Sequence, residues 1–128
     1  VDFRRGYSGE FTSIGHQTYH QDDEILSVQQ WLEIHFMTPV TIEELASKAN
    51  MSSRTFKRRF KDATGETPLA YIQQLRIEQG KEYLKHSDKN IEEIAWAVGY
   101  QDPGHFTRLF KRTYGMNASA WRQNYRTH

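Results

Sequence analysis

Two segments of this 128-residue chain repeat one pattern, offset by 49 to 50 residues. The first copy, residues 42–65, begins with IEELA, and the second, residues 91–115, begins with IEEIA. Each copy then has two phenylalanines four residues apart in a basic stretch, and each ends in glycine. A repeat of this length that occurs only twice indicates duplication of a supersecondary unit, because a solenoid needs three or more copies.

Each copy opens with a signal for the start of a helix. Thr41 is followed three residues later by Glu44, and Asn90 is followed at the same spacing by Glu93. Both pairs match a capping box, in which a short polar side chain and a carboxylate satisfy the first backbone amides of a helix. Apolar residues then recur at helical spacing, so a short helix is predicted in each copy.

A tight turn and a second helix are predicted to follow each short helix. Asn50 and Gly99 are residues that tolerate a left-handed backbone, which ends a helix and starts a turn. Ser52 and Asp102 come next and are typical N-caps of a new helix. Short helix, turn and second helix form a helix-turn-helix, and the chain is therefore predicted to contain two.

The second helix of each copy is predicted to carry positive charge on its outward faces. Its buried stripe is a pair of phenylalanines, Phe56 and Phe60 in one copy and Phe106 and Phe110 in the other. The outward basic residues are Arg54, Lys57, Arg58 and Lys61, and then His105, Arg108, Lys111 and Arg112. One basic helical face is often only a solvated surface. Two of them, each in the second helix of a helix-turn-helix, indicate a polyanionic ligand.

The remaining segments complete an all-α fold of seven helices without a strand. We expect residues 1–21 to form a linker or arm and residues 22–128 to form a double helix-turn-helix domain. Its predicted parts are a first unit (22–66), a connecting helix (67–86) and a second unit (87–128). The connecting helix would be roughly 28 Å long at 1.5 Å per residue.

Composition and charge exclude several classes of function. The chain has no cysteine, which excludes disulfides, thiolate nucleophiles and cysteine-ligated zinc, and which fits the cytoplasm. No segment has the length and apolarity of a membrane span. Residues 1–52 carry a net charge of −5 and residues 53–128 one of +6, and this local charge is what attracts a polyanion.

No catalytic or metal-binding pattern is present. The sequence contains no paired carboxylates, no glycine-rich phosphate loop and no nucleophile with its base, so we expect neither an enzyme nor a cofactor. His16 and His20 are four residues apart but lack a third ligand nearby, and we expect no metal site. Trp31, Trp96 and Trp121 occupy apolar stripes or matched repeat positions, and we expect all three in the core.

The order helix, helix-turn-helix, long connecting helix, helix-turn-helix and closing helix resembles the DNA-binding domain of the AraC/XylS family of bacterial transcription regulators. The resemblance is carried by IEEIA at 91–95, VGY at 98–100, HFTRLFK at 105–111 and YG at 114–115, and covers about residues 23–126. Ala118 replaces the family's usual proline. Arg4-Arg5-Gly6 and MSSRTF at 51–56 also resemble the branch whose N-terminal half is a DJ-1/PfpI-like domain, which this chain would lack.

This resemblance implies sequence-specific binding of double-stranded DNA, with two recognition helices in successive major grooves. At the family's base-contacting positions stand Arg54, Lys57, Arg58, His105, Thr107 and Arg108, and the expected phosphate contacts are Arg59, Lys61, Lys111 and Arg112. We expect a monomeric fragment and, for the full-length regulator, RNA polymerase as a partner. Pro103 and Gly104 leave few polar side chains at the start of the second recognition helix, which we expect to be the less selective one. The other interpretation is that Gly104 only lets the backbone approach closely. The alternative is a helical protein- or RNA-binding module without sequence-specific DNA readout.

Overall fold

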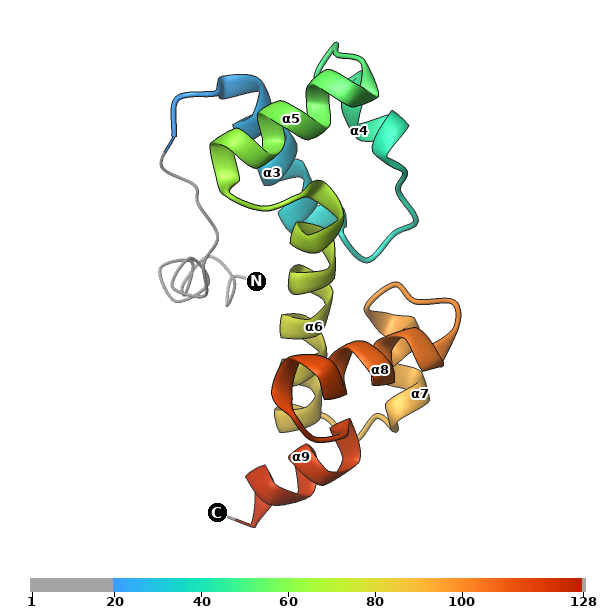
Figure 1. Cartoon of the computed structure of the whole chain (residues 1–128). Helices are drawn as coiled ribbons and strands as arrows, with labels where there is room; N and C mark the ends of the chain where they lie inside the picture. The colour runs from blue at the N-terminus through green and yellow to red at the C-terminus, as the bar shows by residue number, and fades with distance from the viewer. Residues whose placement is uncertain (1–19, 128) are drawn as a thin grey trace. The chain divides into compact units, whose positions relative to one another are not determined.

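A computed structural model describes residues 20–127, which form seven α-helices and no strand. The predicted all-α class with two helix-turn-helix units and a long connecting helix is confirmed (Figure 1). The helices are α3 (Asp23–His35), α4 (Ile42–Lys48), α5 (Ser53–Thr64), α6 (Pro68–His86), α7 (Ile91–Ala97), α8 (Pro103–Tyr114) and α9 (Ala118–Arg126). The predicted arm lies almost wholly outside the described residues, as do the Arg4-Arg5-Gly6 motif and His16.

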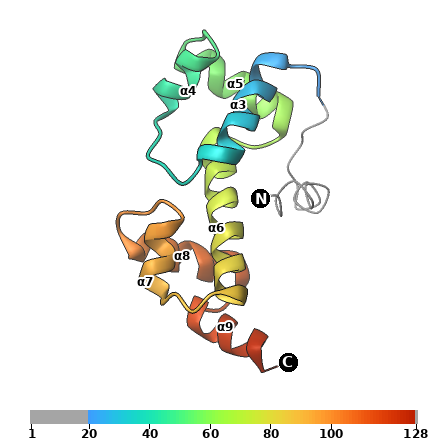
Figure 2. The same ribbon diagram turned by 180° about the vertical axis from the view of Figure 1, so that it is seen from behind.

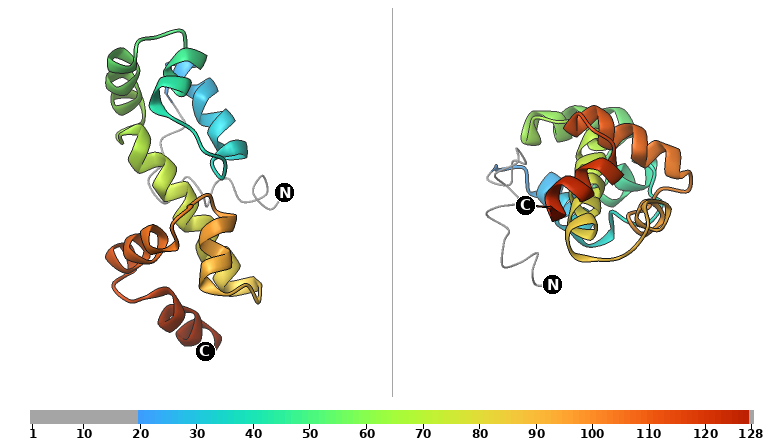
Figure 3. Two further views of the ribbon diagram at one scale, coloured as in Figure 1. Left: turned by 90° about the vertical axis from the view of Figure 1, so that its right-hand side faces the viewer. Right: turned by 90° about the horizontal axis from the view of Figure 1, so that it is seen from below.

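The described residues fall into two compact units that divide within α6. The first contains residues up to Ile34 and Val40–Ile72, and the second contains His35–Pro39 and the residues from Gln73 onward. Each unit holds one helix-turn-helix, α4–α5 in the first and α7–α8 in the second. The connecting helix α6 is continuous over its 19 residues (Figures 2 and 3).

The predicted capping boxes are both confirmed. The Glu44 amide donates to Thr41 Oγ1 over 3.1 Å, and the Thr41 amide donates back to Glu44 Oε1 over 2.8 Å. Asn90 and Glu93 exchange the same two hydrogen bonds, both of 2.8 Å. These bonds satisfy amides that have no partner inside the helix, so the start of each short helix is set by local sequence.

The turns inside the two helix-turn-helix units depend on left-handed residues, as predicted. Asn50 has φ 57° and Gly99 has φ 112°. At Gly99 a side chain is also excluded by space, because a Cβ atom there would lie 2.9 Å from the Met37 carbonyl oxygen. The second unit therefore needs glycine at this turn for two independent reasons.

The core of the first unit is built around three aromatic rings. Phe56 and Phe60 of α5 lie 5.6 Å apart between ring centroids, and Phe60 meets Tyr71 of α6 edge-on at 5.2 Å. All three are fully buried. The Tyr71 hydroxyl accepts a hydrogen bond of 3.3 Å from the buried Gln29 amide of α3, so this polar pair is satisfied inside the core.

The core of the second unit repeats the phenylalanine pair. Phe106 and Phe110 of α8 are fully buried, with ring centroids 5.8 Å apart. Trp121 of α9 packs edge-on against Phe110 at 6.0 Å. Gly80 of α6 lies directly beneath the Phe106 ring, since a Cβ atom at that position would come within 2.6 Å of it. The close approach of α6 and α8 therefore requires glycine here.

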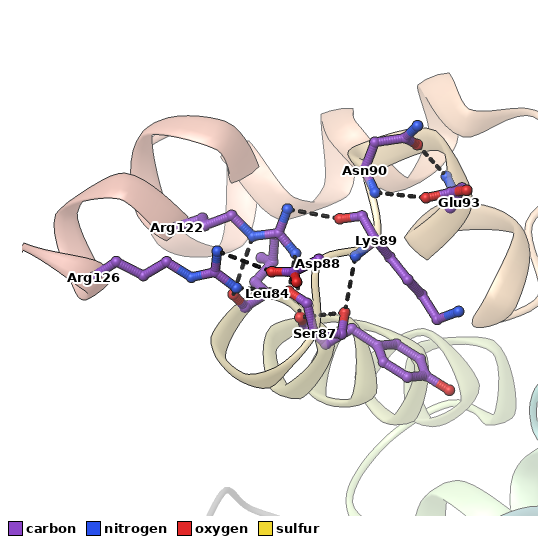
Figure 4. Close-up of polar contacts among 9 residues, drawn as sticks. Leu84, Ser87, Asp88, Lys89, Asn90, Glu93, Arg122 and Arg126 are labelled. Atoms are coloured by element: carbon purple, nitrogen blue, oxygen red, sulfur yellow. Dashed lines mark hydrogen bonds and ion pairs between the residues drawn. The ribbon is translucent and has the colours of Figure 1, made fainter.

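Two arginines of α9 cover the C-terminal end of α6 (Figure 4). The carbonyl oxygens that accept hydrogen bonds from Arg122, over 2.6 to 3.2 Å, belong to Tyr83, Leu84, Ser87 and Lys89. Arg126 donates to the Leu84 and Ser87 carbonyls and pairs with the Asp88 carboxylate at 3.7 Å. The last carbonyls of a helix lack internal partners and carry partial negative charge, so guanidinium groups stabilise this end.

The expectation that all three tryptophans lie in the core is wrong for Trp96, which is 54% exposed. The seven-residue helix α7 buries Ile94 and Ala95, and Trp96 follows them onto the solvent side. Trp31 and Trp121 are half-buried, and the Lys48 ammonium lies 4.4 Å from the centre of the Trp31 ring.

Replacing Gly80 by alanine should lower the free energy of unfolding by about 1–3 kcal/mol, because the added methyl overlaps the Phe106 ring. This loss should appear although alanine is the better helix former. Chemical denaturation measures it. The neighbouring Gln79→Ala is the control and should change stability by less than about 0.5 kcal/mol. A Gly80→Ala protein as stable as the parent would show that α6 and α8 do not meet this closely.

Candidate nucleic-acid interface

The recognition helix α5 presents a row of exposed cations opposite its buried phenylalanines. Arg54, Lys57, Arg58 and Lys61 are all exposed, whereas Phe56 and Phe60 are fully buried. The helix starts at the N-cap Ser52, whose hydroxyl accepts a hydrogen bond of 3.2 Å from the Thr55 amide. Because the phenylalanines fix the rotation of α5, these four basic side chains face solvent together.

Arg59 of the same helix is placed differently from its neighbours. Its guanidinium makes a two-pronged contact with the Asp22 carboxylate, over 3.0 Å from Nε and 2.7 Å from Nη2. Nη2 also donates to Glu24 Oε1 over 2.7 Å. Paired hydrogen bonds of this kind are the geometrically best-defined form of arginine–carboxylate contact. The sequence analysis expects Arg59 to contact a DNA phosphate. In the structure its guanidinium instead binds the carboxylates of Asp22 and Glu24 at the start of α3.

The Asp22 carboxylate is also part of the start of α3. Asp22 Oδ1 accepts a hydrogen bond of 3.3 Å from the Ile25 amide, and the Asp22 backbone carbonyl accepts one of 2.8 Å from the Leu26 amide. Partial burial opposes ionisation of Asp22, but the hydrogen bonds from Arg59 and the Ile25 amide outweigh it and hold its pKa below the ordinary value of 3.8. The same contacts raise the pKa of Arg59. This ion pair therefore joins α3 to the recognition helix.

The recognition helix α8 also exposes basic groups, on the side opposite Phe106 and Phe110. The exposed residues are His105, Arg108, Lys111 and Arg112. His105, Arg108 and Arg112 border one pocket of about 220 Å³ together with Tyr100, Leu109 and Gln73. The structure thus brings three of the predicted contact residues of α8 onto one surface.

Thr107, a predicted base contact, is half-buried in α8. Its hydroxyl donates a hydrogen bond of 3.1 Å to the Gly104 carbonyl of the preceding turn. The oxygen can still accept a hydrogen bond, but the proton is used within the helix. A contact from Thr107 to a base would therefore be made as an acceptor or through its methyl group.

The N-terminus of α8 carries an exposed carboxylate among these basic groups. Asp102 Oδ1 caps the helix by accepting from the Gly104 amide over 3.0 Å. Its Oδ2 lies 4.0 Å from His105 Nε2 and 4.0 Å from Arg108 Nη2. The sequence identified Asp102 as an N-cap but gave no indication of these charged neighbours.

Asp22 and Glu24 were missed as partners of the interface, although a local signal existed. Arg59 directly precedes Phe60, so it sits at the edge of the buried stripe, where the side chain meets α3. Acidic residues in the first turn of α3 are by themselves only a signal for the start of a helix. An arginine beside a buried stripe and an unpaired acidic helix start together could have suggested the contact.

Within residues 20–127, no group of three or more histidine, aspartate or glutamate side chains is placed to hold a metal ion. In the same part of the chain, no helix combines the length and apolarity needed to cross a membrane.

Among curated proteins, the chain is similar to the HTH-type transcriptional activator RhaS of several bacteria. The identity is 32% over 112 residues for Klebsiella pneumoniae (strain 342), covering 88% of this chain and 40% of that protein. For Citrobacter koseri it is 36% over 104 residues, covering 81% of this chain and 37% of that protein. The chain therefore spans about two fifths of the length of these relatives.

Among solved structures, the chain is similar to the DNA-binding domain of AdpA, a global transcriptional factor, which was solved in complex with a target DNA. The sequence identity is 34% and the TM-score 0.78, and the match covers 81% of this chain and 94% of that one. The C-terminal domain of AraT, a response regulator from Geobacillus stearothermophilus, has 26% identity and a TM-score of 0.75, covering 79% and 84%. An AraC-type regulator from Chromobacterium violaceum shares the fold, at 21% identity and a TM-score of 0.72 over 80% and 92%.

A family model described as a helix-turn-helix domain matches residues 45–124, which include both repeat copies from Leu45 onward. The chain belongs to this helix-turn-helix family, and the predicted resemblance to the DNA-binding domains of AraC/XylS regulators is confirmed.

Proposed function

We propose that this chain is the sequence-specific DNA-binding domain of a bacterial transcription regulator, with no catalytic activity of its own. The observation that carries the proposal is the repeated arrangement of α5 and α8. Each is the second helix of a helix-turn-helix, is anchored by two buried phenylalanines, and exposes a row of basic side chains. A helix of this kind fits the major groove of B-DNA. The DNA complex of AdpA and the activator RhaS support the same function here.

The base contacts of α5 are assigned to Arg54, Lys57 and Arg58. These side chains are exposed, and their charge and length suit the acceptor atoms of guanine in the major groove. In α8 the corresponding residues are His105, Thr107 and Arg108. Arginine bound to guanine through two hydrogen bonds discriminates against other bases by about 1–3 kcal/mol.

The phosphate contacts are assigned to Lys61 of α5 and to Lys111 and Arg112 of α8. All three are exposed and have no ion-pair partner among the described residues. Arg59 is given another role, because Asp22 and Glu24 already neutralise it. We assign it to positioning α5 against α3.

The α6 helix makes a one-chain binding mode possible. Its 19 residues correspond to a length of roughly 28 Å, comparable with the ~34 Å helical repeat of B-DNA. One chain carrying both recognition helices would then bind successive major grooves, as a monomer and at an asymmetric site. The full-length regulator would act in the cytoplasm with RNA polymerase as its partner.

Selection from random duplex DNA should return two short conserved blocks whose centres lie about 10 base pairs apart. One chain should bind per two-block site, as measured by sedimentation of the complex. The matched duplex RNA should bind without sequence preference, because the deep, narrow major groove of A-form RNA does not admit a helix. Equal binding of RNA and DNA would favour the alternative of a general helical binding module.

Arg58→Ala should weaken binding to the selected site by about 1–3 kcal/mol and relax the base preference at one or two pairs in one block. Lys61→Ala, on the same exposed face of α5, is the matched control. It should weaken binding to all sequences alike and reduce the salt dependence by about one phosphate contact. Unchanged base preference in Arg58→Ala would show that another face of α5 meets the bases.

Asp22→Asn should destabilise the protein at neutral pH but hardly at all in acid. The pKa of Asp22 is lower in the folded protein than its ordinary value of 3.8. The ion pair therefore stabilises the folded protein at pH values above 3.8, and this stabilisation is lost as the pH falls through the folded-state pKa. Denaturation at about pH 7 and about pH 3 should therefore show a difference from the parent that shrinks in acid. Asp62→Asn, which removes an exposed carboxylate of α5, should show no such pH-dependent difference.

A further inference from the structure

The start of α8 contains an arrangement that the cap of a helix does not need. Asp102 uses one carboxylate oxygen, Oδ1, to cap the helix at the Gly104 amide. The other oxygen, Oδ2, is directed at the basic groups and lies 4.0 Å from both His105 Nε2 and Arg108 Nη2. The hydrogen bond to the Gly104 amide restrains the Asp102 carboxylate, and the Arg108 guanidinium lies beside it, the two side chains being 63% and 65% exposed. The carboxylate is therefore the partner that a backbone hydrogen bond restrains.

Gly104 provides the space for this contact. A Cβ atom at Gly104 would lie 2.9 Å from Arg108 Nη1 and 3.3 Å from Asp102 Oδ1. The Arg108 guanidinium thus lies next to the backbone of Gly104 as well as near the Asp102 carboxylate. Glycine is a poor helix former, and here it occupies the first turn of α8, away from the turn that ends α7. Space for Arg108 is a reason for glycine at this position.

We propose that Asp102 is a positioning residue that holds Arg108 in place for reading guanine, and that this pair sets the base selectivity of the second recognition helix. The inference rests on the proposed DNA-binding function. A guanidinium has five N–H donors in a rigid plane, so an edge directed at Asp102 leaves the other donors free for the O6 and N7 atoms of guanine. Holding a flexible side chain before binding reduces the entropy that binding costs.

The same carboxylate should also act against wrong sequences. An unpaired arginine at the edge of the groove can bind the nearest phosphate of any DNA, which raises affinity without selectivity. Asp102 competes with phosphate for Arg108 and repels the DNA backbone by its own charge. Selectivity is a difference between two affinities, so lowering the affinity for all other sequences increases it. The second recognition helix, expected to be the less selective because of Pro103 and Gly104, is thereby assigned a specific contact.

Asp102→Asn separates this role from that of the helix cap, because asparagine caps a helix as well as aspartate but carries no charge. The base pair read by Arg108 is first identified as the one whose preference Arg108→Ala removes, an effect of roughly 5- to 150-fold. In competition binding, Asp102→Asn should reduce that preference by roughly threefold or more. Its affinity for unrelated duplex DNA should stay equal or rise. A loss of the cap alone would instead lower affinity for every sequence.

Gly104→Ala tests the same contact without a change of charge. The added methyl should displace Arg108 and reduce the preference at the same base pair, while helix content is kept or increased. Asp62→Asn on α5 is the matched charge control, and it should leave the preference at that base pair unchanged. In the Arg108→Ala background, Asp102→Asn should cause no further loss of preference, because the two residues act as one unit.

Two results would overturn the proposal: full base preference in both Asp102→Asn and Gly104→Ala, or an equal loss of affinity for all sequences in Asp102→Asn. Failure of the proposed function looks different. In that case the parent protein itself would show no base preference in either block, before any variant is compared.

Discussion

Burial of two phenylalanines per recognition helix is the interaction on which the rest of this structure depends. Phe56 and Phe60 are fully buried in one unit, and Phe106 and Phe110 in the other. Removing one such ring would cost about 3–5 kcal/mol, several times more than any exposed charge contributes. The rings therefore fix the rotation of α5 and α8 about their axes, and with it the side chains that face solvent. The positions of the buried phenylalanines therefore determine which basic side chains are exposed on α5 and α8.

The features that sequence predicted best are those that neighbouring residues determine. Capping by Thr41 and Asn90 and the left-handed turns at Asn50 and Gly99 each involve residues within a few positions, and all form as predicted. The repeat strengthened each assignment, because the same local signals recur in two copies. Secondary structure and its order could therefore be obtained without knowledge of tertiary contacts.

The features that the sequence analysis missed are a contact between distant segments and a side chain that lies off the buried stripe of its helix. Arg59 binds carboxylates 35 and 37 residues away, and a basic helical pattern does not distinguish it from its exposed neighbours. Trp96 is apolar but lies off the helical stripe formed by Ile91, Ile94, Ala95 and Val98, so it faces solvent while Ile94 and Ala95 are buried. For Trp96 the helical spacing already places the ring off the stripe, whereas for Arg59 the local signal indicates a contact and only the tertiary structure shows that the two segments meet.

The end of the chain shows how a local substitution is absorbed when several interactions share one task. Ala118 stands where the AraC/XylS pattern that this chain resembles has proline, whose fixed φ favours the first residue of a helix. In this chain the start of α9 is set by Asn117, whose side chain accepts a 2.8 Å hydrogen bond from the Ala120 amide. Proline would remove an amide that has no helical partner in any case, so alanine loses little at this position. The position of α9 is then secured by Arg122 and Arg126 on the carbonyls that end α6, and by Trp121 on the ring of Phe110. The second phenylalanine pair, and with it the recognition helix α8, is thus enclosed by contacts that do not depend on proline at the start of α9.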